Sequence, residues 1–230
     1  MRKARFWVAA AAAGLFAVTV AFAGDDKPEK KPAAEPAEKP AAVKVGQEVP
    51  DFTLLDCAGT KHKLSDYKDK ILVLGWVNQE CPWSRKSVPV VKALQKKYAD
   101  KGVAWLGVES TFSRKPEENE TYIKDTELPF TILMDNDGKV GKTFGAKTTP
   151  HIFVINKGKL AYAGALHDDQ FGKKPESEVR NYVDDALGAV LAGKDVPLAE
   201  TTPWGCGVKY KDADKAKHAD HGPEKPAEKP

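Results

Sequence analysis

A continuous apolar stretch at residues 71–77 ends four residues before a cysteine. Its length and its Ile, Leu and Val content are typical of a strand buried on both faces, as in parallel sheets covered by helices. After Cys81, apolar residues recur at helical spacing from about residue 82 to residue 99. A buried strand followed directly by a helix restricts the chain to a helix-covered sheet, with Cys81 at the strand–helix junction.

Other segments extend this alternation of strands and helices. Strands are expected at residues 51–55, 103–108, 130–134, 151–155 and 159–163, helical turns at 63–67 and 140–144, and helices at 117–126 and 175–191. This order predicts an α/β sandwich with a mixed central β-sheet and helices on both faces. Ligands of such sheets bind at the carboxyl ends of central strands, so we expect the functional site near residues 77–84.

The two ends of the chain differ in composition from this predicted domain. Residues 1–23 combine a basic start, an apolar run and an Ala-Phe-Ala ending, which predicts a cleaved signal peptide. Residues 24–44 and 210–230 are rich in charged residues, Pro and Ala, which predicts a disordered linker and a disordered charged tail. The folded domain is therefore expected at residues 45–209, in a periplasmic or secreted protein without a membrane span after cleavage.

The charge balance gives no reason to expect a nucleic-acid partner. The chain has 36 basic and 33 acidic residues, a formal charge of +3. Arg2, Lys3 and Arg5 account for this whole excess and lie in the predicted signal peptide. The mature protein is thus neutral, and its partners should be recognised at the functional site rather than through bulk charge.

Cys81 is the candidate nucleophile. At the start of a helix, unpaired backbone N–H groups and the helix dipole lower the pKa of a thiol, and the thiolate is the reactive form. Glu80 would oppose this effect if its carboxylate lay close to the sulfur. The alternative is an unreactive cysteine that only packs at the end of a strand.

Three segments together resemble the thioredoxin superfamily, and most closely its redoxin branch, the alkyl hydroperoxide reductase and thiol-specific antioxidant family. They are residues 49–54 (Val-Pro-Asp-Phe-Thr-Leu) with 64–68 (Leu-Ser-Asp-Tyr-Lys), the Cys81 junction, and residues 148–150 (Thr-Thr-Pro). The resemblance covers residues 45–193. It implies a thioredoxin-like fold whose chemistry needs no cofactor and no metal ion.

The resemblance also implies roles for particular residues. Pro150 would be a cis proline beside Cys81, and the backbone of Thr149 would contact a substrate. The expected substrate-binding residues are Asn78, Pro82, Trp83, Ser84, Thr149 and Pro150. His151 is a further candidate, for assisting proton transfer, although its side chain could equally point away along the strand.

The chain departs from the patterns of both related groups. Thioredoxins have C-x-x-C, but Ser84 replaces the second cysteine, so no disulfide can close within this motif. Peroxiredoxins have P-x-x-x-T-x-x-C, but Leu74 and Asn78 replace the proline and the threonine, and no arginine occupies the active-site position near Pro150. Asn78 and Arg85 are the remaining candidate donors to a peroxide, and neither matches the motif.

Cys206 is the candidate resolving thiol. It lies in Thr-Pro-Trp-Gly-Cys-Gly-Val-Lys-Tyr at residues 202–210, which looks like a C-terminal motif of some redoxin-like proteins. Trp204 offers an anchor, and the flanking glycines would let the backbone approach another sulfur. Three arrangements stay open: a Cys81–Cys206 redox disulfide, a structural Cys57–Cys206 disulfide, or no intrachain bridge.

Together these features predict an extracytoplasmic thiol oxidoreductase or antioxidant. Cys81 would attack a disulfide of a protein partner or a hydroperoxide, and Cys206 or an external thiol reductant would resolve the product. The alternative is a weakly active or non-catalytic thioredoxin-fold module that binds a partner protein or copper. Copper carriers of this fold use C-x-x-x-C, and Arg85 at the second cysteine position argues against copper.

Overall fold

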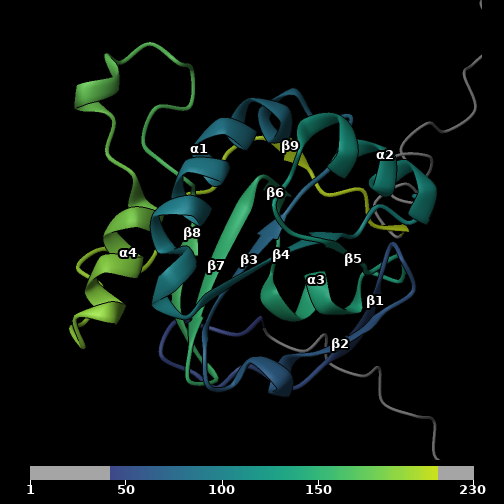
Figure 1. The fold of residues 1–230 in the computed structure, drawn as a ribbon, viewed down its shortest axis with the longest axis horizontal. Coiled ribbons are helices and arrows are strands. Elements are labelled where there is room, and N and C mark those ends of the chain that lie inside the picture. Colours follow the sequence, from purple (N-terminus) through teal and green to yellow (C-terminus); the bar gives the residue numbers. More distant parts are fainter. Residues whose placement is uncertain (1–41, 212–230) are drawn as a thin grey trace, which may run out of the picture. The chain divides into compact units, whose positions relative to one another are not determined.

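The computed structural model describes residues 42–211, so the predicted signal peptide and most of the predicted linker and tail lie outside it. Seven strands of this region form one sheet in the order β2-β1-β5-β4-β3-β7-β8 (Figure 1). Their bounds are β1 Thr53–Asp56, β2 Lys61–Lys63, β3 Ile71–Trp76, β4 Val103–Glu109, β5 Ile132–Met134, β7 His151–Asn156 and β8 Lys159–Gly164. The strands β3, β4 and β5 are parallel, whereas β7 and β1 run antiparallel to their neighbours, so the sheet is mixed as predicted.

Helices cover both faces of this sheet. They are α1 Pro82–Tyr98, α2 Pro116–Thr126, α3 Lys139–Phe144 and α4 Tyr182–Leu191. Alternate residues of β3 point to opposite faces: Val73 packs in a cluster with α1 and α4, and Leu74 packs in a cluster with α3. Both side chains are 0% exposed. This confirms the prediction of a central strand buried on both faces.

The helix predicted at residues 175–191 is shorter than expected. A single 3-10 turn occupies Glu176–Glu178, and α4 begins only at Tyr182. The Asn181 side chain accepts a hydrogen bond from the backbone N–H of Asp184 and caps the helix there. The backbone of Arg180 meanwhile exchanges two hydrogen bonds with Asp168, which holds the residues before α4 in an extended conformation.

The packed chain extends slightly beyond both predicted boundaries. Val43, in the predicted linker, donates to the carbonyl of Thr143 at 2.9 Å and packs against the cluster under α3. Tyr210, in the predicted tail, donates its hydroxyl proton to the carbonyl of Ala146 at 2.9 Å. Val43 and Tyr210, just outside the predicted bounds of 45 and 209, therefore make contacts with the domain.

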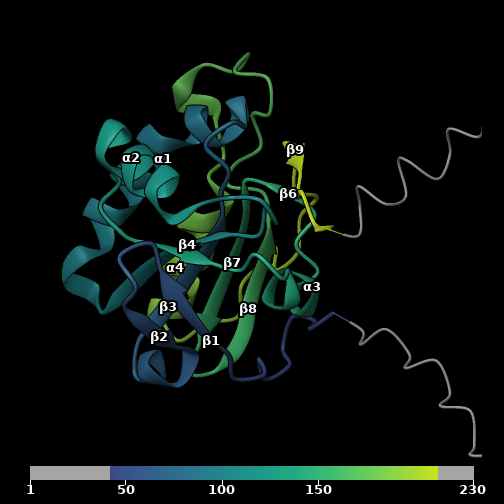
Figure 2. The ribbon, with the colours of Figure 1, turned by 90° about the vertical axis from the view of Figure 1, so that its right-hand side faces the viewer.

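Two very short strands were not predicted. They are β6 Thr148–Thr149 and β9 Cys206–Gly207, which pair antiparallel in a separate sheet. Figure 2 shows them side by side, beyond the end of β7. They bring the C-terminal cysteine to the end of the main sheet where β3 meets α1.

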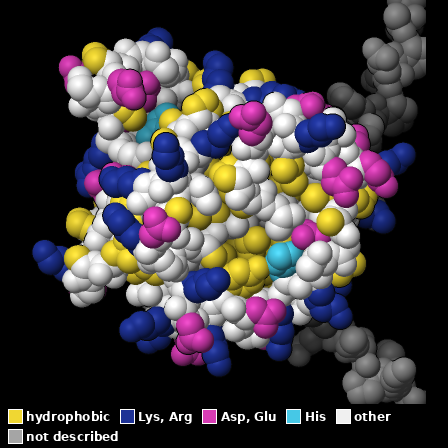
Figure 3. All heavy atoms as spheres, viewed as in Figure 1, with side chains coloured by type: hydrophobic (Ala, Val, Ile, Leu, Met, Phe, Trp, Pro, Cys, Tyr) yellow, Lys and Arg dark blue, Asp and Glu magenta, His cyan; other side chains and the backbone are white. Residues whose placement is uncertain are grey.

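The described surface carries charges of both signs. Figure 3 shows Lys and Arg side chains interspersed with Asp and Glu on the face seen in Figure 1. Among residues 42–211, no helix has both the length and the apolar character needed to cross a membrane.

Candidate active site

Cys81 occupies the N-cap position of α1, directly after the loop that leaves β3. Its side chain is 2% exposed, and its Sγ donates to the carbonyl oxygen of Thr149 at 2.9 Å. The Thr149–Pro150 peptide bond is cis, as predicted. The structure therefore brings Cys81, Thr149 and Pro150 together although 68 residues separate Cys81 from Thr149.

The loop between β3 and α1 is held by Asn78. Its backbone N–H donates to Oγ of Ser84 at 3.2 Å, its Nδ2 donates to Oγ1 of Thr111 at 2.9 Å, and its Oδ1 accepts from the backbone N–H of Glu80 at 2.7 Å. Asn78 and Ser84 are buried. The polar groups that were expected to face a substrate thus fix the loop that carries Cys81.

Two residues after β4 support the same loop and were not anticipated. Thr111 accepts from Asn78, and the buried Arg114 side chain pairs with Glu80 at 3.3 Å and with Glu118 at 3.1 Å. The carboxylate of Glu80, which precedes Cys81, is therefore paired with a positive charge. Nothing in the sequence around these two residues connects them with Cys81, because the contacts depend on β4 lying beside β3.

Cys206 lies next to Cys81 through the pairing of β6 with β9. In this pair Thr149 stands directly opposite Cys206, and its Oγ1 donates to the carbonyl of Cys206 at 3.4 Å. The preceding Gly205 has φ of +136°, and a Cβ atom there would overlap the carbonyl oxygen of Thr149 and lie 3.2 Å from the nitrogen of Pro150. Only glycine lets the chain pass so close to the cis peptide.

We call residues 201–210 the C-terminal strap, because contacts along its length hold it on the domain. Trp204 Nε1 donates to the carbonyl of His167 at 3.1 Å, and the backbone N–H of Val208 donates to the carbonyl of Lys147 at 3.0 Å. The ring of Tyr210 fills the space beside Gly138 and Gly141 of the α3 region, where any side chain would collide with it. The strap therefore lies across the end of the sheet that carries Cys81.

The two thiols at this site have opposite pKa shifts. Burial by itself raises the pKa of the Cys81 thiol, but hydrogen bonds to its thiolate from the side chains of Cys206 and Thr149 and from the backbone of Ser84 outweigh burial and lower the pKa. Burial and the neighbouring Cys81 sulfur raise the pKa of the Cys206 thiol to about 11. Cys81 is therefore the thiol that ionises first, as a nucleophile must.

This arrangement predicts a measurable effect of Cys206 on Cys81. The rate of alkylation of Cys81 should rise with pH through its lowered pKa, and Cys206→Ala should move the midpoint to higher pH because one hydrogen bond to the thiolate is lost. The measurement is the pH profile of alkylation, with each cysteine assigned by peptide mass. An unchanged midpoint in the variant would contradict this coupling.

Cys57 lies far from both of these cysteines. Its backbone N–H donates to Ile132 of β5, and its Sγ lies 3.9 Å from Oγ1 of Thr131. Cys57 contacts β5, whereas Cys206 pairs with β6, which directly precedes β7 in the chain. In the main sheet, β4 and β3 lie between β5 and β7. With strands about 4.8 Å apart, this separation is well beyond the roughly 7 Å limit on Cα atoms joined by a disulfide. The Cys57–Cys206 alternative is therefore wrong for this fold.

Two other candidates are engaged elsewhere. His151 is buried, its Nδ1 accepts from the backbone N–H of Lys147 at 3.2 Å, and burial together with the Lys147 charge lowers its pKa to about 3. It is therefore neutral at physiological pH. Arg85 donates from Nε to the carbonyl of Gln79, and its guanidinium lies 5.4 Å from the centre of the Tyr122 ring.

An aromatic cavity of about 380 Å³ opens beside the junction. Trp83 forms one wall and makes edge-to-face contacts with Trp204 at 5.7 Å and with Phe171 at 6.3 Å between ring centroids. The Phe171 side chain is 64% exposed. We call this the Trp83 pocket. The two tryptophans each lie two residues from one of the paired cysteines, so the pocket adjoins the redox site.

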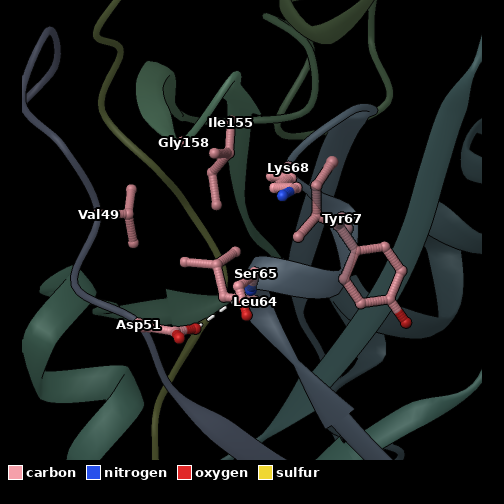
Figure 4. A pocket seen from close by; sticks show the side chains of 9 residues that line it. Val49, Asp51, Leu64, Ser65, Tyr67, Lys68, Ile155 and Gly158 are labelled. Carbon is pink, nitrogen blue, oxygen red and sulfur yellow. Dashed lines mark hydrogen bonds between the residues drawn. The ribbon is translucent and has the colours of Figure 1, made fainter.

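A second cavity of about 210 Å³ lies at the opposite end of the sheet (Figure 4). Leu72, near the start of β3, lines it together with Val49 and Leu64, and Oδ1 of Asp51 accepts from the backbone N–H of Ser65 at its rim. None of the nine residues that line it is a cysteine. This cavity is therefore separate from the thiol site.

The fold and the paired thiols define a thioredoxin-like protein, and comparison with known proteins agrees. Residues 45–163 match the AhpC/TSA family, and the chain belongs to this family. It is 26% identical over 141 residues to the thiol-disulfide oxidoreductase ResA of Bacillus thuringiensis subsp. konkukian, which covers 61% of this chain and 78% of the relative. It is 29% identical over 143 residues to the thioredoxin-like protein YneN of Bacillus subtilis, covering 62% and 80%.

A solved structure shows the same fold. An uncharacterized conserved protein from Geobacillus kaustophilus superposes with a TM-score of 0.65 at 26% identity, covering 78% of this chain and 98% of that one. The predicted thioredoxin-like α/β fold and membership of the redoxin family are confirmed. The prediction of a thiol-dependent oxidoreductase is likewise confirmed by the family and by the named relatives.

Proposed function

We propose that this protein is a two-cysteine thiol–disulfide oxidoreductase, in which Cys81 is the nucleophile and Cys206 the resolving thiol. The observation that carries the proposal is the position of Thr149: its carbonyl accepts from Cys81 Sγ, and Cys206 stands opposite it in the β6–β9 pair. Cys206 thus takes the part that the second cysteine of a C-x-x-C motif would have. The similarity to a thiol-disulfide oxidoreductase supports disulfide exchange as the reaction.

The reaction runs as two exchanges. The Cys81 thiolate attacks one sulfur of a substrate disulfide, the substrate S–S bond breaks, and the other substrate sulfur leaves as a thiolate that takes up a proton. Cys206 then loses its proton and attacks Cys81 Sγ, which releases the second substrate thiol and leaves a Cys81–Cys206 disulfide. The substrate gains two electrons and two protons, and an external thiol reductant returns them to the protein.

Two observations favour disulfides over hydroperoxides as substrates. Activating a peroxide needs donors aimed at the oxygens beside the thiolate, but the Asn78 amide is directed at Oγ1 of Thr111 and the Nε of Arg85 at the carbonyl of Gln79. The lowered pKa of Cys81 argues against a scaffold without chemistry, which was the alternative function.

The disulfide map of the oxidised protein tests this proposal. After treatment with a disulfide oxidant and digestion without reduction, we expect a peptide pair joining Cys81 to Cys206, with Cys57 free. Addition of dithiothreitol should remove the link, and fresh oxidant should restore it. A link that resists cycling, or a stable mixed disulfide on Cys81 while Cys206 stays free, would contradict the two-cysteine mechanism.

The proposal extends to location. The sequence of residues 1–23 supports export, which would place the thiols in an oxidising compartment where disulfides form and persist. The Gly-Cys-x-Val-Lys-Tyr sequence at 205–210 supports a likeness to redoxin-like proteins with a C-terminal cysteine.

A further inference from the structure

The strap occupies the place beside Cys81 that an extended polypeptide could take. Its strand β9 pairs with β6 through backbone groups, with Gly207 opposite Thr148 and Cys206 opposite Thr149. Backbone pairing of this kind accepts any extended chain, and side-chain pockets then supply the specificity. Another chain with a cysteine at the position of Cys206 would make the same pairs once the strap had left.

The strap also shows which side chain such a chain would offer. Trp204, two residues before Cys206, makes edge-to-face contacts with Trp83 at 5.7 Å and with His167 at 5.0 Å between ring centroids. Its Nε1 donates to the carbonyl of His167. An aromatic side chain two residues before a cysteine is thus held against the first turn of α1, beside the nucleophile.

The Trp83 pocket continues beyond Trp204. Val90 of α1, Val179 and the exposed Phe171 also line it, together with Lys86 and Lys174. The cavity remains open to solvent with the strap in place, so it offers apolar surface that the domain itself leaves uncovered. Surface of this type commonly marks a site of interaction with another protein.

We propose that this redox site binds, in place of the strap, an extended polypeptide that carries an aromatic side chain two residues before its cysteine. The inference rests on the proposed function, because it names the substrate of that same site. The strap is the intramolecular occupant, and the Trp83 pocket selects the aromatic side chain.

A peptide with the strap's own sequence is the direct probe. The nonapeptide of residues 202–210 is prepared with its cysteine in a mixed disulfide with thionitrobenzoate, and full-length Cys206→Ser serves as the enzyme. The Cys81 thiolate attacks the peptide sulfur, a Cys81–peptide disulfide forms, and thionitrobenzoate leaves as the better leaving thiolate. Its absorbance reports the rate, and the mass of the product identifies Cys81.

The matched control peptide has alanine at the position of Trp204. We expect the tryptophan peptide to react about tenfold faster, as one buried aromatic contact would give. In a Trp83→Ala background this ratio should fall to about one. It should persist in Leu55→Ala, which removes an exposed apolar side chain on β1, away from the site. Tyr210→Ala should raise the rate of the peptide, since it removes an anchor of the competing strap.

The mixed disulfide of glutathione and thionitrobenzoate separates failure of this inference from failure of the proposed function. If it reacts with Cys81 while the two peptides react equally, the preference for an aromatic side chain is refuted and the proposed function stands. If Cys81 reacts with none of the three, both fail.

Discussion

Cys81→Ser is expected to abolish disulfide reduction by this protein. The hydrogen bonds from Cys206, Thr149 and Ser84 favour a thiolate at this position, and a serine hydroxyl does not ionise there at physiological pH. We expect a loss of roughly 10³-fold or more, as when an essential nucleophile is removed from an enzyme. The assay is reduction of a disulfide-bonded protein with dithiothreitol as electron donor, at matched enzyme concentrations and corrected for the uncatalysed rate.

Cys57→Ser is the matched control for this substitution. The same sulfur-to-oxygen change is made at a buried cysteine beside Thr131, the residue before β5, and β5 lies two strands from β3. This variant should keep the wild-type rate of disulfide reduction. Full activity in Cys81→Ser, or equal losses in both variants, would rule out Cys81 as the nucleophile.

The central strand and the nucleophile were predictable because their signals are local. The apolar run that became β3 and the helical spacing after Pro82 each lie within one continuous segment, and together they place Cys81 at a helix start. The cis bond before Pro150 was also predicted, from the resemblance to a family rather than from periodicity. Local sequence patterns therefore predicted the position of Cys81, and the family resemblance predicted the cis bond before Pro150.

The rest of the site depends on contacts between distant residues. The strands β6 and β9 have two residues each, too few to show any alternation of apolar and polar residues. Their pairing joins Thr149 to Cys206, which lie 57 residues apart. The contact of Tyr210 with Gly138 and Gly141 could not be predicted either. Two nearby glycines in a sequence do not indicate which aromatic ring will pack against them.

The shortened α4 has the same kind of cause. Residues 175–191 have a helical apolar pattern, but Asp168 pairs with the backbone of Arg180, and Asn181 caps the helix that follows. The helix α4 begins after these extended residues and packs on β7 and β8. The start of α4 was thus decided by a contact across 12 residues and by the cap at Asn181 rather than by periodicity.

Gly205→Ala should stop the Cys81–Cys206 disulfide from forming while the domain stays folded. A methyl group at this position would overlap the carbonyl oxygen of Thr149 and approach its carbon to 2.8 Å, and the φ of +136° is strained for any residue with a Cβ atom. These obstacles are backbone atoms of Thr149 and Pro150 rather than the flexible end of a side chain, so the strap has to move. Displacement of a reacting group by about 1 Å commonly costs about 100-fold in rate, and we expect disulfide closure to slow at least that much.

Gly207→Ala is the matched control, because it makes the same change two residues further along the strap. No heavy atom lies within 4 Å of a Cβ at Gly207, and its φ is not in the left-handed region. Disulfide closure should therefore run at close to the wild-type rate. It is measured by mixing the protein with oxidant, quenching rapidly with acid and alkylating the remaining thiols. Unfolding temperatures of both variants should match the wild type, since neither glycine belongs to the buried clusters of the sheet. Wild-type closure in Gly205→Ala would mean that Cys206 reaches Cys81 without the β6–β9 pairing, and the role given to the strap would then be wrong.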